Sequence, residues 1–152
     1  MIEKPALTVE PKINAMKIKD AGNMTINELK IVLERACLEY GLDVIVDTDV
    51  VTSGRLFDKS TIPCVVIKNA QYPFDYFQEV VTLKTQGIYA FVDVYYTGRS
   101  KNIRRIAAGN TEHKTMTGSI IGAIKKAMVS NDAIDEENNY YEMLTDAIES
   151  VF

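Results

Sequence analysis

Four segments with β-strand character follow one another between residues 43 and 96, and no helical period separates them. Their expected ranges are 43–51, 62–68, 75–86 and 88–96. Parallel strands need long crossover connections, whereas antiparallel strands can be joined by short turns. Gly87 stands between the last two segments and suits a tight hairpin. The chain therefore predicts an antiparallel sheet of about four strands.

Helical patterns lie on both sides of these strands. Thr25 and Glu28 have the spacing of a capping box, in which each side chain satisfies a backbone N–H of the first turn. A helix over 26–40 should follow, with charged residues on one side and an apolar stripe on the other, made of Ile26, Leu29, Leu33, Ala36, Cys37 and Tyr40. Apolar residues at helical steps near 103–107, 117–129 and 135–151 predict two or three C-terminal helices. This grouping of strands and helices indicates an α+β fold with the C-terminal helices packed on the sheet.

The N-terminal segment has no helical period. Residues 1–23 contain Pro5, Pro11 and Gly22, which interrupt regular structure. We expect an arm over 1–23, followed by a single α+β domain over 24–152, because 152 residues suit one domain. Such an arm is either frayed or docked on a neighbouring surface, and the sequence leaves both outcomes open.

The composition is that of a globular protein with a packed core. Hydrophobic residues make up 47% of the chain and charged residues 25%, unlike the composition of disordered chains. No apolar run approaches the roughly 18 residues of a membrane span, and the first residues lack the plan of a signal peptide. Cys37 and Cys64 stand in apolar surroundings, which indicates reduced core residues. We therefore expect a cytoplasmic protein that makes no membrane contact.

Charge is divided unevenly towards the C-terminus. Between residues 95 and 126, seven basic residues stand against one acidic residue, whereas residues 127–152 contain seven acidic residues and no lysine or arginine. A basic cluster attracts nucleic acid because it releases counterions from phosphates. The acidic helix expected over 135–151 can instead pair with the basic block and cancel its field at short range. Nucleic acid is therefore not an expected partner.

Two aspartates of the first predicted strand form a candidate metal site. Asp47 and Asp49 are two residues apart, so both project from one strand face about 7 Å apart. That separation lets two carboxylates share a hydrated Mg²⁺ ion. The alternation of polar and apolar residues over 43–51 also fits a plain solvated face. A phosphoryl-transfer site would need a further carboxylate and a cation, which Asp58 and Arg55 supply only if the chain folds back.

Four basic residues form a candidate site for a small anionic or phosphorylated ligand: Arg99, Lys101, Arg104 and Arg105. They follow Gly98, and a glycine beside a helix start exposes backbone N–H groups that attract anions. The segment lacks the spacing of a phosphate-binding loop. A turn with Ser100 as the helix cap also accounts for this pattern.

No catalytic constellation is visible, and no cofactor is expected. The one histidine, His113, lies in a polar segment, and no spacing joins it to a cysteine or an activated serine.

Gly118 and Gly122, four apart in an apolar helical pattern, would let another backbone approach closely. The leading hypothesis is a non-catalytic binding or assembly protein that acts through a protein partner or self-association. The alternatives are a binder of an anionic ligand and a Mg²⁺-dependent phosphoryl-transfer enzyme.

Overall fold

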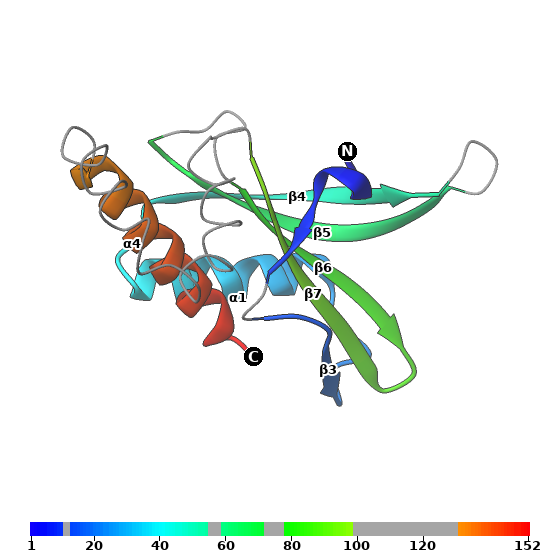
Figure 1. The fold of residues 1–152 in the computed structure, drawn as a ribbon. Coiled ribbons are helices and arrows are strands. Elements are labelled where there is room, and N and C mark those ends of the chain that lie inside the picture. Colours follow the sequence, from blue (N-terminus) through cyan, green and yellow to red (C-terminus); the bar gives the residue numbers. More distant parts are fainter. Residues whose placement is uncertain (11–12, 55–58, 72–77, 99–130) are drawn as a thin grey trace, which may run out of the picture.

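The computed structural model describes residues 1–10, 13–54, 59–71, 78–98 and 131–152, with side chains in the last range from residue 139 onward. Figure 1 shows the elements along the chain. They are β1 (Ile2–Glu3), the 3-10 turn η1 (Lys4–Ala6), β2 (Thr8–Val9), β3 (Met16–Lys19), α1 (Ile26–Glu39), β4 (Val44–Ser53), β5 (Ser60–Asn69), β6 (Gln78–Gln86), β7 (Tyr89–Thr97) and α4 (Asn131–Glu149).

The strands form one mixed sheet of seven strands, so the predicted antiparallel sheet of about four strands was wrong. The strand order is β1-β4-β5-β6-β7-β2, and β3 also pairs with β7. Each of β4 to β7 runs antiparallel to the next, but β1 runs parallel to β4. β1 and β2 escaped prediction because they have two residues each, too few to show a period of two. β3 lies where Met16 and Ile18 alternate with lysines, a pattern that permits a short strand.

The N-terminal arm is docked on the sheet of its own chain. β1 lies along β4 at one edge, and β2 lies along β7 at the other. In Figure 1 the dark blue arm passes in front of the strands. Its side chains Ile2 and Leu7 pack against an apolar cluster that consists of Val51, Cys64, Val66 and Val80. The arm therefore covers part of one face of the curled sheet.

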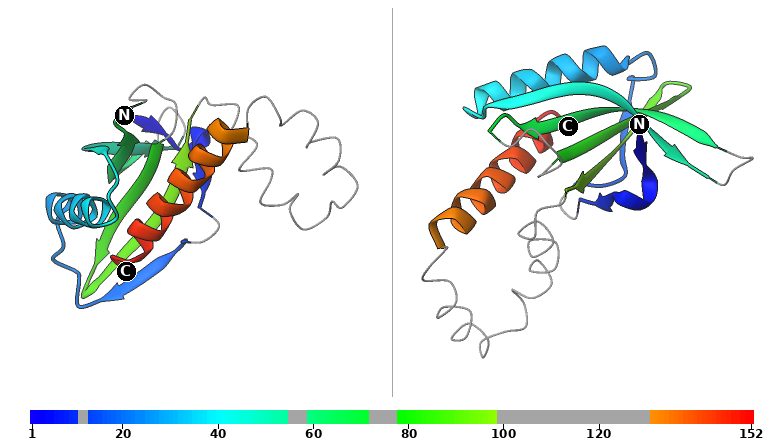
Figure 2. Two further views of the ribbon diagram at one scale, coloured as in Figure 1. Left: turned by 90° about the vertical axis from the view of Figure 1, so that its left-hand side faces the viewer. Right: turned by 90° about the horizontal axis from the view of Figure 1, so that it is seen from above.

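The two helices of the described residues pack on the opposite face (Figure 2). Leu29 and Leu33 of α1 join Leu144 and Ile148 of α4 in the main core, together with alternate residues of the strands. In β5, Val65 and Ile67 belong to this core, whereas Cys64 and Val66 belong to the cluster beneath the arm. Successive side chains point to opposite faces of a strand, so the two cores lie on either side of the sheet.

The helix predictions had different outcomes. The capping box of Thr25 and Glu28 is present at the start of α1, as predicted. The expectation of two or three C-terminal helices on the sheet was wrong, since the described residues hold one, α4. The helices predicted near 103–107 and 117–129 fall outside the described residues. Apolar residues at helical steps show that a helix can form, but not that it packs on a sheet.

Burial along β4 changes sides partway along the strand. Val46 is buried in the helix-side core, but Val50 on the same face is 36% exposed. Val51, which points the other way, is buried beneath the arm. Regular alternation alone would bury Val50 together with Val46. Among the described residues, however, Val46 but not Val50 belongs to the helix-side core, while the arm covers the opposite face at Val51.

Both cysteines are free and buried, as predicted, and they lie in different cores. Burial raises the pKa of Cys37 and of Cys64 to about 11, so little reactive thiolate forms near neutral pH. We expect neither thiol to react with a chromogenic disulfide reagent in native buffer, and both to react at once after unfolding in guanidinium chloride. Rapid stoichiometric labelling of either thiol in the native protein would contradict this burial.

Candidate functional site

Helix α1 carries apolar side chains on two opposite sides. Leu29, Leu33 and Cys37 are buried against the sheet. Ile31 and Leu38, by contrast, are 54% and 69% exposed. At about 100° per residue, these two side chains share one line on the side of the helix away from the core. Figure 2 shows α1 at the periphery of the fold. We call Ile31 and Leu38 the outer line of α1.

Charged side chains flank the outer line. Glu34 lies on one flank and Arg35 on the other, each about 50° from the line, and both are exposed. The helix that carries them is fixed at its start. The Thr25 N–H donates to the Glu28 carboxylate at 2.8 Å, and the Glu28 N–H donates to the Thr25 hydroxyl at 3.2 Å. The outer line therefore belongs to a well-anchored element.

This surface was not predicted from the sequence. Charged residues dominate the side of the helix away from the apolar stripe, and Ile31 and Leu38 stand among them. The available signal was their separation of seven residues, which is close to two helical turns and places both side chains on one line.

The structure places Asp47 and Asp49 on one face of β4, opposite Val66 and Cys64 of β5. The Asp49 carboxylate lies 2.8 Å from the amino group of Met1 and accepts a hydrogen bond from the backbone N–H of Val50 at 2.8 Å. Burial alone would raise the pKa of Asp49. The hydrogen bonds outweigh that effect and lower the pKa below its ordinary value.

Two lysines share a hollow with this aspartate pair. The hollow beside Asp47 and Asp49 is lined by Lys30 and Lys68 and by the neutral side chain of Gln78. Within the described part of the chain, no group of three or more His, Cys, Asp or Glu residues could hold a metal ion. Asp58 and Arg55 lie outside that part. The Mg²⁺ site therefore stays a prediction that rests on two carboxylates.

The predicted anion site also stays untested. Its four residues, Arg99, Lys101, Arg104 and Arg105, lie outside the described residues, as do His113, Gly118 and Gly122.

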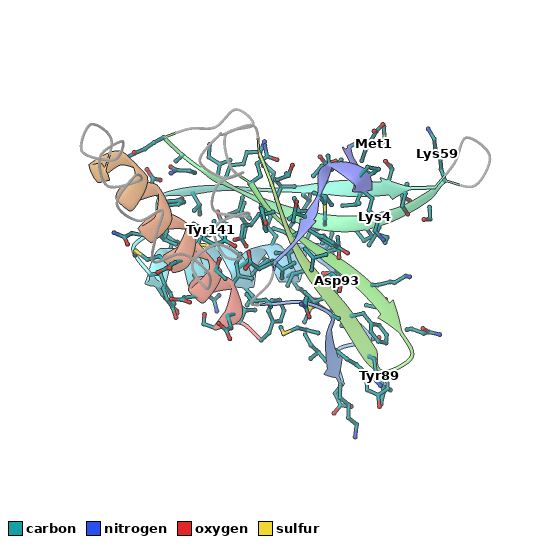
Figure 3. The ribbon with its side chains drawn as sticks, viewed as in Figure 1. Met1, Lys4, Lys59, Tyr89, Asp93 and Tyr141 are labelled. Carbon is teal, nitrogen blue, oxygen red and sulfur yellow. The ribbon has the colours of Figure 1, made fainter. Side chains whose placement is uncertain are left out.

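A second feature that the sequence analysis missed is a buried carboxyl cluster, which consists of Glu10, Glu79, Tyr141 and Thr145. Glu10 follows β2, Glu79 belongs to β6, and both side chains are fully buried. The Tyr141 hydroxyl donates to the Glu10 carboxylate, and the Thr145 hydroxyl donates to Glu79 at 3.1 Å. Tyr141 and Thr145 are four residues apart, so they share one face of α4. Figure 3 labels Tyr141 on this helix.

Glu79 favours its protonated form. Burial raises the pKa of this carboxyl well above 4.5, and the nearby charge of Glu10 raises it further. The hydrogen bond from Thr145 opposes both effects without offsetting them. The Oε2 atom of Glu79 has no hydrogen-bond partner among the residues that the structure describes. Ionisation of Glu79 would therefore create a buried negative charge with a hydrogen-bond donor at only one of its two oxygens, which is costly in an apolar interior.

The cluster holds elements together instead of facing solvent. Glu10, Glu79 and Thr145 are fully buried, and Tyr141 is 5% exposed. Tyr96 of β7 lies opposite Glu79 in the sheet, and its ring meets that of Tyr141 edge-on with centroids 6.1 Å apart. The cluster thus connects the arm, β6 and β7 with α4. The one local signal for it was the acid at position 79, which stands directly before the apolar pair Val80 and Val81 in the predicted strand 75–86.

The raised pKa of Glu79 predicts that stability falls as pH rises. The folded protein binds this proton more tightly than the unfolded chain, so the free energy of unfolding decreases above about pH 4.5 until Glu79 ionises in the folded state. One proton limits this slope to about 1.4 kcal/mol per pH unit. We expect Glu79→Gln to remove this slope in urea unfolding curves between about pH 5 and pH 8. The exposed control Glu39→Gln should retain it, and parallel curves for Glu79→Gln and the unsubstituted protein would contradict the assignment.

In comparisons with known proteins, no protein-family model, no curated protein and no solved structure matches the chain. In the described residues, neither helix has the length and apolar character that a membrane crossing needs.

Proposed function

We propose that this chain is a non-catalytic binding or assembly protein that acts through protein–protein contacts, and that the outer line of α1 makes the contact. The exposure of Ile31 and Leu38 supports the proposal most directly. Burying a side chain of this size contributes roughly 1.5–3 kcal/mol relative to leaving it in water. Neither residue gains much of that stabilisation within the described fold.

The anchoring of α1 also favours binding. Its inner side is packed into the main core through Leu29, Leu33 and Cys37, and its first turn is capped. A partner that docks on the outer line therefore does not have to order the backbone first. Preorganisation of this kind reduces the entropic cost of association.

Two other functions remain predictions. An anionic-ligand binder would use Arg99, Lys101, Arg104 and Arg105, and a Mg²⁺-dependent enzyme would use Asp47 and Asp49. The described residues add no observation that favours either over a protein contact.

Substitution of the outer line tests this proposal against a matched control. Ile31→Glu places a charge in the proposed contact, whereas Ile88→Glu changes a side chain that is 52% exposed at the β6–β7 turn. We expect Ile31→Glu to weaken association at least tenfold and Ile88→Glu to leave it unchanged. Each variant should keep its thermal unfolding midpoint, because both side chains already lie largely in water.

The measurement combines sedimentation velocity of the purified full chain with cross-linking to proteins of the source cell, read by mass spectrometry. A specific complex that Ile31→Glu removes supports the proposal. A monomer that recovers no partner, or a complex that is insensitive to Ile31→Glu, contradicts it.

A further inference from the structure

We infer that the partner of the outer line is a second copy of this chain, and that the two α1 helices pack parallel and in register about a two-fold axis. This inference rests on the proposed function, since it names the partner for the same surface. It is carried by the seven-residue spacing of Ile31 and Leu38 and by the charges beside them.

The spacing suits a pair of helices. Seven residues at 100° each return to within about 20° of the starting direction, so Ile31 and Leu38 form a narrow apolar line. A coiled-coil seam has two apolar residues in every seven. The outer line supplies one in every seven, with Glu34 and Arg35 beside it, so it can form only a narrower and weaker seam of the same direction. With α1 parallel to its copy, Ile31 meets the second copy's Ile31 and Leu38 meets the second copy's Leu38.

The flanking charges select the parallel arrangement. In a parallel two-fold pair, each flank of one helix faces the opposite flank of the other. Glu34 then faces the second copy's Arg35, and symmetry repeats this pair on the other side. In an antiparallel two-fold pair the same flanks meet, so glutamate would face glutamate and arginine would face arginine. Like-charge contacts disfavour that arrangement.

The length of the helix limits the strength of the contact. A helix of 14 residues is about 21 Å long and offers only two side chains of its outer line. Stable protein interfaces usually bury about 1,200–2,000 Å² in total. We therefore expect a weak dimer whose population rises with concentration.

Disulfide trapping detects such a dimer even when it is weak. Ile31→Cys puts a thiol at the proposed contact, while the native thiols of Cys37 and Cys64 are buried and slow to react. Under mild oxidation of the full chain, we expect Ile31→Cys to form disulfide dimers at least tenfold faster than Ile88→Cys. A mixture of Ile31→Cys and Leu38→Cys should form mostly same-position dimers. Dominant mixed dimers would overturn the parallel arrangement.

Reversal of the flanking charges provides a second test of the dimer. Glu34→Arg places two arginines at each flanking contact, and Arg35→Glu places two glutamates there. A single exposed ion pair contributes little to association. Because symmetry places each substitution in two contacts, we expect each single reversal to weaken dimerisation by roughly tenfold. The double variant Glu34→Arg/Arg35→Glu recreates an opposite-charge pair and should restore dimerisation in sedimentation equilibrium.

The outcomes separate this inference from the proposed function. If Ile31→Cys is trapped no faster than the Ile88→Cys control, the inference of a second copy is wrong. If the double reversal fails to restore association, the inferred parallel orientation is wrong. If a different protein still binds the unsubstituted chain and loses binding with Ile31→Glu, the proposed function stands without the dimer. If neither a dimer nor a partner depends on Ile31, both fail.

Discussion

The outer strands β4 and β7 carry backbone N–H and C=O groups that need hydrogen-bond partners, and the N-terminal residues supply partners along part of each edge. Unpaired edges invite strands from other chains. β1 pairs with β4 at Val51 and Thr52, while β2 and β3 pair with two stretches of β7. Because one continuous segment reaches both edges, it must also cross the sheet face between them. The edge pairing therefore brings Ile2 and Leu7 onto that face and creates the second core.

The buried carboxyl cluster connects this arm with the C-terminal helix. Buried ionisable groups contribute little net stability and often less than apolar residues of similar size. Their effect here is positional. Glu10 and Glu79 come from segments on either side of β7, and the hydroxyls that meet them lie four residues apart on α4. Sliding α4 along its axis would separate both pairs at once, so the cluster favours one register of the helix on the sheet. Disturbance of the arm should consequently reach α4 through Glu10.

Local signals predicted local structure, and features that depend on distant segments escaped them. The capping box at Thr25 depends on residues within one turn, so its prediction was confirmed. The burial of Val51 in place of Val50 depends on the arm, which lies about fifty residues earlier in the chain. The alternation of side chains along β4 therefore cannot predict which of the two valines is buried. The buried glutamates have the same origin, because an acid in a β-segment reads as solvated until a helix from the C-terminus covers it. The outer line differs, because the seven-residue spacing of Ile31 and Leu38 is visible in the sequence. These two residues were overlooked because charged residues dominate that side of the helix.

Exposed apolar side chains are common on proteins, so exposure alone does not mark a contact surface. Ile88 and Met143 are exposed as single residues of this chain and need no partner to explain them. Ile31 and Leu38 differ because they are aligned on a helix whose opposite side already supplies a complete apolar stripe to the core. Polar residues at both positions would leave that stripe, the capping box and the docking of α1 unchanged. The apolar identity of the outer line therefore contributes nothing to the packing of the described residues, and for this reason we propose the outer line, and not Ile88 or Met143, as the contact surface.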